Sequence, residues 1–249
     1  MIRFDILTLF PKMFSSPLDE GMLKRAQEKN LIDVRIHNIR DFALDKHHTA
    51  DDYPYGGGQG MVMKAEPIIR SIEKVKSLEN DSKVILMTPQ GRRLDQRFIV
   101  HMSKFCHLII VCGRYEGVDE RVRQYVDEEI SIGDYIISGG ELAAMVLLDA
   151  VSRMIPRVLG NSESIDDESF CNSLLEYPQY TRPREHKGLN VPEELLSGNH
   201  QRINDWRRFQ SLKRTLERRP DLLEEAELSG KDIRILSEIK KELDISRKC

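Results

Sequence analysis

Residues 112–122 read Cys-Gly-Arg-Tyr-Glu-Gly-Val-Asp-Glu-Arg-Val, and residues 132–142 read Ile-Gly-Asp-Tyr-Ile-Ile-Ser-Gly-Gly-Glu-Leu. Each run starts where an apolar, strand-like segment ends, and each places glycines beside charged residues. Glycine lets a backbone approach a bound ligand closely, and binding residues concentrate on loops at strand ends. Any one of these glycines could serve only a tight turn, but their concentration after two strands predicts one small-molecule pocket built from loops.

Apolar segments that alternate with helical patterns surround the two runs. Alternation of this kind predicts an α/β fold in which a parallel sheet is covered on both faces. In such folds ligands bind at the carboxyl ends of the strands, where both runs lie. We expect strands at 2–9, 31–36, 84–87, 108–112 and 129–132, and helices at 17–29, 67–76, 94–105 and 142–154.

The composition is that of a globular protein with a sizeable core. The chain has 249 residues, 40% hydrophobic and 32% charged, which fits one large domain or two modest ones. No apolar run approaches the roughly 18 residues of a membrane span. Arg3 and Asp5 make the first ten residues a strand and not a secretory signal. These features predict a soluble cytoplasmic protein.

Cysteine and histidine spacing indicates neither a metal site nor a disulfide framework. Cys106, Cys112, Cys171 and Cys249 form no CxxC pair and have no histidine partners at zinc spacing. We therefore expect reduced, structural thiols. The adjacent pair His47-His48 has diverging side chains and no third ligand in view, so no metal site is assigned.

Two nucleotide-binding motifs are excluded. The loop Tyr55-Gly-Gly-Gly-Gln-Gly60 is rich in glycine, but Lys64 comes four residues after its last glycine and no Ser or Thr follows the lysine. That spacing rules out Walker A chemistry. The first predicted strand leads into Phe10-Pro11-Lys12 without a glycine, so the dinucleotide fingerprint is missing as well.

The character of the chain changes after Gly160. Residues 161–169 are polar and acidic, which on composition alone favours a solvated, mobile linker. Residues 177–183 contain two prolines and must be extended, and helical patterns follow at 201–219 and 222–243. We expect a first domain at 1–160, a flexible linker at 161–170 and a small all-α C-terminal domain at 171–249.

The first of these C-terminal helices carries a local excess of positive charge. Seven Lys or Arg residues lie between Arg202 and Arg219, against only Asp205 and Glu217. A solvated helix face is the simpler interpretation. However, Trp206 among the arginines also suits nucleic-acid contact, and a local basic patch attracts a polyanion whatever the net charge of −3. Both interpretations stay open at this point.

Short motifs spread in order over nearly the whole chain resemble those of one family. They are Asp52-Tyr-Pro-Tyr-Gly-Gly-Gly-Gln-Gly-Met61, Thr88-Pro-Gln-Gly91, Cys112-Gly-Arg-Tyr-Glu-Gly117, Ser131-Ile-Gly-Asp-Tyr135, Ser138-Gly-Gly-Glu-Leu142, Ser152-Arg153, Tyr180-Thr-Arg-Pro183 and Leu196-Ser-Gly-Asn-His200. In these pieces the sequence is similar to the bacterial tRNA (guanine-N1)-methyltransferases of the TrmD family, which belong to the SPOUT class.

The resemblance implies a knotted SPOUT N-terminal domain with a parallel sheet and a deep trefoil knot. The loops of that knot would hold the methyl donor S-adenosylmethionine in a bent shape, with backbone amides reading the adenine. No redox cofactor is needed. The residues implied for donor binding are Met87, Thr88, Pro89, Gln90, Gly113, Tyr115, Glu116, Gly117, Ile132, Gly133, Asp134, Tyr135, Ile136, Ile137, Gly139 and Gly140.

The resemblance also implies methylation of N1 on a guanosine that lies 3′ of the tRNA anticodon and follows another guanosine. N1 of guanine holds a proton at neutral pH, so a carboxylate base is required. A cation such as Arg153 would stabilise the negative charge that grows on O6. Where the family carries its catalytic aspartate, alignment without gaps places Glu168, preceded by Asp167. We expect Glu168 to be the base and Asp167 a substitute or neighbour.

The implied assembly is a homodimer, in which the linker and C-terminal domain of one subunit complete the active site of the other. Family members are thought to use Mg²⁺, but no ligand cage is visible in the sequence. Only Glu116 and Glu168 could contribute, through water, so the ion is unassigned. The implied tRNA contacts are Asp51, Tyr180, Arg182, Arg184, Asn199, Arg207, Arg208, Lys213 and Arg214.

Two alternatives stay open. A knotted RNA ribose 2′-O-methyltransferase would need no carboxylate to remove the N1 proton. A catalytically silent tRNA-binding module would fit the presence of Glu168 in place of the family's aspartate.

Overall fold

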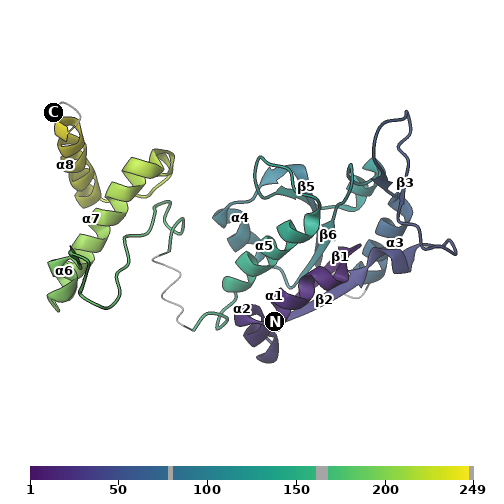
Figure 1. Ribbon diagram of the computed structural model, residues 1–249, viewed down its shortest axis with the longest axis horizontal. Coiled ribbons are helices and arrows are strands. Elements are labelled where there is room, and N and C mark those ends of the chain that lie inside the picture. The colour runs from purple at the N-terminus through teal and green to yellow at the C-terminus, as the bar shows by residue number, and fades with distance from the viewer. Residues whose placement is uncertain (78–80, 161–167, 247–249) are drawn as a thin grey trace. The chain divides into compact units, whose positions relative to one another are not determined.

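The computed structural model describes residues 1–77, 81–160 and 168–246. The chain divides into two compact units, Met1–Gly160 and Asn161–Cys249 (Figure 1). Most of the predicted linker, including Asp167, lies outside the described residues. No helix in the described part of the chain is long and apolar enough to cross a bilayer.

The first unit is built on a five-stranded sheet in which every neighbouring pair is parallel. The strand order is β2-β1-β6-β5-β7. The predicted α/β fold with a parallel sheet is confirmed, with strand bounds shifted by a few residues. The strands are β1 (Ile2–Thr8), β2 (Ile32–Asn38), β5 (Ser82–Arg93), β6 (His107–Cys112) and β7 (Glu128–Ser131).

The central strands are buried along their whole length and mostly apolar because helices cover both faces of the sheet. All residues of β1 and of β6 are buried. Since side chains alternate between faces, Phe4 and Ile110 pack in one core, while Leu7 and Val111 pack in the other. The first core is covered by α2 (Gly21–Glu28), α4 (Gln96–Met102) and α5 (Gly140–Arg153), and the second by α3 (Ala65–Lys76).

The prediction of one continuous helix over residues 17–29 is wrong. The structure has a short 3-10 helix η1 (Pro11–Phe14), then α1 (Ser15–Asp19), and α2 starts afresh at Gly21. Glu20 between them is extended, and Gly21 has a φ of +63°, a left-handed conformation that glycine adopts without strain. The apolar periodicity runs through this break, so the pattern did not reveal it.

Strand β5 is longer than the segment predicted at 84–87. Its pairing with β7 changes register between Met87 and Arg92, so the residues between them leave the ladder as an irregular loop. A Cβ on Gly91 would lie 2.4 Å from the backbone carbon of Glu129, so only glycine lets the strand return this close to β7. The polar sequence of the loop concealed the continuation of the strand.

The remaining elements of the first unit are short and lie in loops. The strands β3 and β4 pair with each other in antiparallel orientation. These elements are η2 (Ile39–Phe42), β3 (Asp51–Asp52), β4 (Val62–Met63) and η3 (Glu120–Tyr125).

The second unit is mainly helical and has a small core of Leu174, Leu212, Leu236 and Ile239. It also contains a two-stranded hairpin, whereas we expected an all-α domain. Its elements are β8 (Glu185–His186), β9 (Leu189–Asn190), α6 (Glu193–Leu196), α7 (His200–Arg218), η5 (Pro220–Glu224) and α8 (Gly230–Ser246).

The predicted helix at 222–243 is interrupted because Ser229 starts a new helix. The Ser229 backbone N–H donates to Asp232 Oδ2 at 2.9 Å, and the Asp232 N–H donates to Ser229 Oγ at 3.2 Å. This reciprocal cap satisfies N–H groups that have no partner inside the helix. Arg208 in α7 also binds Asp232 through both carboxylate oxygens, at 2.8 and 2.9 Å, so the cap joins α7 to α8.

A charged cluster is buried inside the sheet of the first unit. The Asp5 carboxylate is fully buried, with Oδ2 2.7 Å from His107 Nε2 and Oδ1 2.5 Å from His37 Nε2. Arg3 Nη2 donates to Oδ1 at 3.2 Å. Burial by itself would raise the pKa of Asp5, but these partners outweigh it and hold the pKa below its ordinary value.

We expect Asp5→Asn to lower the free energy of unfolding by about 3 kcal/mol at pH 7, because the buried Arg3 and His107 and the partly buried His37 lose a charged acceptor. Since the folded pKa is depressed, the contribution of Asp5 is complete above the unfolded carboxyl pKa of about 3.9 and is lost as the pH falls. The variant should therefore show a flatter loss of stability in acid. Urea unfolding between pH 3 and pH 7 measures both effects.

Asp33→Asn is the matched control on the neighbouring strand. Asp33 pairs with Arg35 at 2.8 Å, but both side chains are partly exposed, so the expected loss is below about 0.5 kcal/mol. Equal losses for the two variants would contradict a special contribution from the buried cluster.

Candidate functional site

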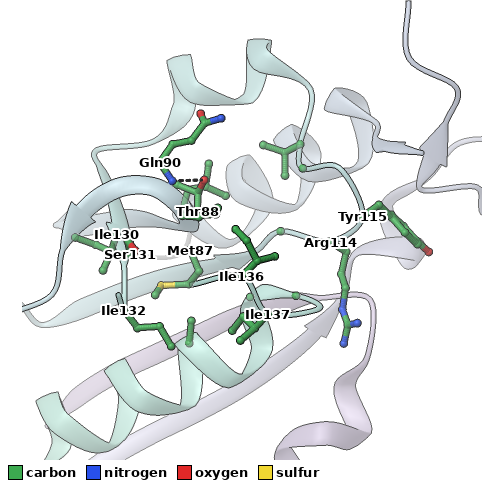
Figure 2. Close-up of a pocket in the computed structure, with 18 of the residues that line it drawn as sticks. Met87, Thr88, Gln90, Arg114, Tyr115, Ile130, Ser131, Ile132, Ile136 and Ile137 are labelled. Carbon is green, nitrogen blue, oxygen red and sulfur yellow. Dashed lines mark hydrogen bonds between the residues drawn. The ribbon is translucent and has the colours of Figure 1, made fainter. Parts of the chain in front are cut away.

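A cavity of about 510 Å³ lies at the carboxyl ends of β5, β6 and β7. Three loops form it: residues 88–91, residues 113–118 and residues 132–140. Figure 2 shows Met87, Ile136 and Ile137 gathered in this pocket, with the Thr88 and Gln90 loop above them. Both glycine-containing runs singled out in the sequence therefore meet at one cavity.

The structure brings together nearly all of the residues predicted for donor binding. The exception is Asp134, which does not line the cavity and lies with its side chain in solvent, 4.0 Å from Arg93. The predicted residues that line the cavity are Met87, Thr88, Pro89, Gln90, Gly113, Tyr115, Glu116, Gly117, Ile132, Gly133, Tyr135, Ile136, Ile137, Gly139 and Gly140.

Glycine is required where two of these loops touch. The Gly140 N–H donates to the Gly113 carbonyl at 2.7 Å, and a Cβ on Gly140 would lie 2.9 Å from Cys112 Cα. A Cβ on Gly139 would lie 2.2 Å from Arg114 Nε. Gly140 is therefore closed to larger residues by backbone atoms, whereas a larger residue at position 139 would displace the Arg114 side chain, and both glycines line the cavity with backbone alone.

Sequence reasoning missed three residues that hold this wall together. Arg114 Nε donates to the buried Glu141 carboxylate at 2.9 Å, and Arg114 Nη1 donates to the Ser138 carbonyl at 3.1 Å. All three lie inside the quoted motifs, but a linear sequence shows only that they are polar. Their role depends on the side chain of Arg114 crossing from one loop to the other.

Arg123 makes a second set of links among the residues around the cavity. Its guanidinium donates to Gln90 Oε1 at 2.5 Å, to Glu120 Oε2 at 2.9 Å and to the Glu129 carboxylate. These bonds connect the 88–91 loop to η3 and to β7. Arg123 and Glu120 also line the cavity and were not singled out from the sequence.

Tyr115 connects the pocket to β3. It has a φ of +58°, an uncommon conformation for a residue with a side chain. Burial raises the pKa of Tyr115, and the hydrogen bond with Asp51 raises it further. The structure thus places Asp51, predicted to contact tRNA, beside a residue that lines the cavity.

Cys112 ends β6 directly beneath the loops but is unsuited to be a nucleophile. Burial raises the pKa of its thiol well above the ordinary value, so the thiolate is disfavoured. Among the described residues no group of three or more Asp, Glu, His or Cys side chains is arranged to hold a metal ion.

The predicted catalytic residues are divided between the two units. Arg153 is the last residue of α5 and does not line the cavity, whereas Glu168 belongs to the second unit. Neither unit contains both. Glu168 lines a smaller cavity of about 330 Å³ with polar neighbours that include Asn172, Asn204 and Arg207.

Among the residues of the second unit predicted to contact tRNA, some have hydrogen-bond partners, some have aromatic contacts, and the rest are at least partly exposed. Arg208 is held by Asp232, and Asn199 caps α7 by accepting from the Arg202 N–H at 3.1 Å, so both have local structural partners. Tyr180 packs against Trp206, and Arg207 lies over the Tyr177 ring at 4.8 Å. The others are at least partly exposed: Arg182, Arg184, Lys213 and Arg214.

We expect Gly140→Ala to lower the free energy of unfolding by about 2 kcal/mol, because the added methyl group collides with backbone that cannot move without displacing α5 or β6. Gly160→Ala is the control, since a Cβ there meets nothing within 4 Å, and it should change stability by less than about 0.5 kcal/mol. Urea unfolding compares the two. Similar small effects would contradict the close contact between the loops.

The family model and the relatives that match this chain all point to the same family. The family model described as tRNA (Guanine-1)-methyltransferase TrmD matches residues 2–225. A protein of Dictyoglomus turgidum is 54% identical over 243 residues, covering 98% of each chain. One of Geotalea uraniireducens is 59% identical over 241 residues, covering 96% of this chain and 98% of its own.

A protein of Geobacillus kaustophilus is 54% identical over 242 residues, covering 97% of this chain and 99% of its own. All three relatives carry the name tRNA (guanine-N(1)-)-methyltransferase. With the family model and these relatives matching almost from end to end, the chain belongs to the TrmD family.

Proposed function

We propose that the chain is an S-adenosylmethionine-dependent tRNA (guanine-N1)-methyltransferase that methylates the guanosine 3′ of the anticodon. The observation that carries the proposal is a loop-built cavity of about 510 Å³ that contains the family's motifs. Relatives more than half identical over nearly the whole length bear the corresponding name. These findings do not favour a ribose 2′-O-methyltransferase or a silent tRNA-binding module.

The methyl donor fits the cavity in chemistry. Gly113 and Gly140 line the cavity without side chains, which suits a flat adenine that is read by amide groups. Met87, Ile136 and Ile137 supply an apolar surface (Figure 2). We propose that these loops form the deep trefoil knot of the SPOUT class. The donor's sulfonium supplies the methyl group and leaves as the neutral thioether.

The proposed reaction requires a base and a cation. Glu168 takes the proton from N1 of guanine, the N1 lone pair attacks the methyl carbon, and the carbon–sulfur bond breaks. Arg153 stabilises the negative charge on O6 while the proton leaves. Glutamate is one methylene longer than the aspartate at this position in the family, a difference that a linker can absorb.

Glu168 begins a tightly held turn of the second unit. Its carbonyl accepts from the Cys171 N–H at 3.3 Å, and the neighbouring Ser169 Oγ accepts from the Glu176 N–H at 3.0 Å. Ser211 Oγ in α7 donates to the Leu175 carbonyl at 2.6 Å. The proposed base is therefore attached to the helical unit, so movements of that unit would carry it.

We further propose that two copies form the active enzyme in the cytoplasm. Residues 1–160 would form the catalytic domain, 161–170 the linker and 171–249 a tRNA-binding domain. The first unit leaves large apolar side chains exposed near the cavity mouth and along α5, as expected for an interface. They are Phe10, Met13, Tyr135, Ile136, Leu142 and Val146.

The proposal predicts which base is methylated. With labelled S-adenosylmethionine and two tRNA transcripts that differ only in guanosine or adenosine just 3′ of the anticodon, label should appear only in the guanosine transcript. Nucleoside analysis should identify it as N1-methylguanosine. Label in a ribose 2′-O-methyl product, or no label despite donor binding, would overturn the proposal.

The proposal also predicts which carboxylate is the base. Glu168→Gln should lower the single-turnover rate by about a hundredfold or more, the usual size of a lost general base. Asp166→Asn is the control for the charge of the linker and should leave the rate within about twofold. A near-normal rate for Glu168→Gln with an inactive Asp167→Asn would move the role to Asp167.

A further inference from the structure

Glu141 is a fully buried carboxylate that the proposed reaction does not use. It lies in the first turn of α5, one residue after Gly140, where the helix N-terminus favours negative charge. Thr8 Oγ1 donates to its Oε1 at 2.7 Å, and Arg114 Nε donates to its Oε2 at 2.9 Å. Both carboxylate oxygens therefore have a specific partner.

Arg114 is held at several points and spans two walls of the cavity. Its own backbone belongs to the loop after β6, where its carbonyl accepts from the Gly117 N–H at 3.0 Å. Its Nη1 reaches the Ser138 carbonyl at 3.1 Å, and Arg114 also forms an isolated antiparallel bridge with Gly139. The guanidinium stacks on Phe10, 4.3 Å from the ring centroid.

The geometry leaves little freedom to this guanidinium once Glu141 is in place. The guanidinium lies so close to Gly139 that it occupies the place of a Cβ on that residue. Only 16% of the Arg114 side chain is exposed. Without the Glu141 carboxylate, the Arg114 guanidinium would be a partly buried charge that has lost its ionic partner, and it would turn toward solvent. The Ser138 carbonyl would then lose its donor, and the two loops would be joined only by backbone contacts.

We propose that Glu141 is a positioning residue for methyl-donor binding, which acts through Arg114 to hold the 113–117 loop and the 138–140 loop at the spacing that the donor requires. Glu141 does not line the cavity, so it exerts its effect without touching the ligand. This inference rests on the proposed function of the cavity as the donor site.

The test measures the dissociation constant of S-adenosylhomocysteine by calorimetry, well below the unfolding temperature of each variant. Glu141→Ala should weaken binding by about tenfold to a hundredfold, because it removes a charged hydrogen bond that orders both loops. Glu141→Gln should recover most of the affinity, since its amide oxygen can still accept from Arg114 while its NH₂ faces the Thr8 hydroxyl.

Thr8→Val is the matched control, because it removes the other hydrogen bond of Glu141 and keeps the one between Glu141 and Arg114. It also removes the hydrogen bond that Thr8 Oγ1 accepts from the Phe10 N–H at 2.9 Å, so any indirect effect through Phe10 would count against the proposal. It should lower the unfolding temperature yet keep donor affinity within about twofold. If Thr8→Val weakens binding as much as Glu141→Ala does at equal stability, Glu141 is only structural and the proposal fails.

A double-mutant cycle tests whether Glu141 acts through Arg114. The variant with both Glu141→Ala and Arg114→Ala should bind S-adenosylhomocysteine no more weakly than Arg114→Ala alone. Additive losses would overturn the proposal, as would normal affinity in Glu141→Ala. If the unaltered protein does not bind S-adenosylhomocysteine at all, the proposed function fails first, which is a different outcome from each of these.

Discussion

The hydrogen bond from the Gly140 N–H to the Gly113 carbonyl, 2.7 Å long, is the contact on which the first unit depends. It brings the start of α5 against the end of β6 so closely that a Cβ would meet Cys112 Cα at 2.9 Å. From this start α5 runs across the sheet and supplies Leu147 and Val151 to the core. The same contact therefore sets the position of a core helix and the wall of the cavity.

Buried charge in this unit is concentrated along β1. Asp5 lies in the middle of the strand with histidine and arginine partners, and Thr8 at the end of the strand donates to Glu141. A buried carboxylate is tolerated only when its oxygens have partners, and both do. The Asp5 cluster serves stability, whereas the Glu141 cluster also touches the loops of the cavity through Arg114.

In the second unit, packing decides which positive charges remain available. Arg208 is bound to Asp232, which raises the pKa of the guanidinium, and Arg219 is bound to Asp221 at 2.6 Å. A phosphate would have to compete with these carboxylates. Lys213 and Arg214 of α7, and Arg182 and Arg184 before it, are thus better placed for a polyanion than Arg208 is.

The sequence by itself determined the parallel α/β sheet, because strands buried on both faces are apolar runs whatever their neighbours. It also determined that two glycine-rich runs border one pocket, since close backbone approach needs glycine. Only the tertiary structure decided that Arg114 joins Glu141 to Ser138, that Gly21 divides the first helix and that β5 resumes at Arg92. The Arg114 links and the return of β5 depend on which backbone or side chain, distant in sequence, lies opposite, and a local pattern does not contain that information. The break at Gly21 depends on a left-handed backbone conformation inside an uninterrupted apolar pattern.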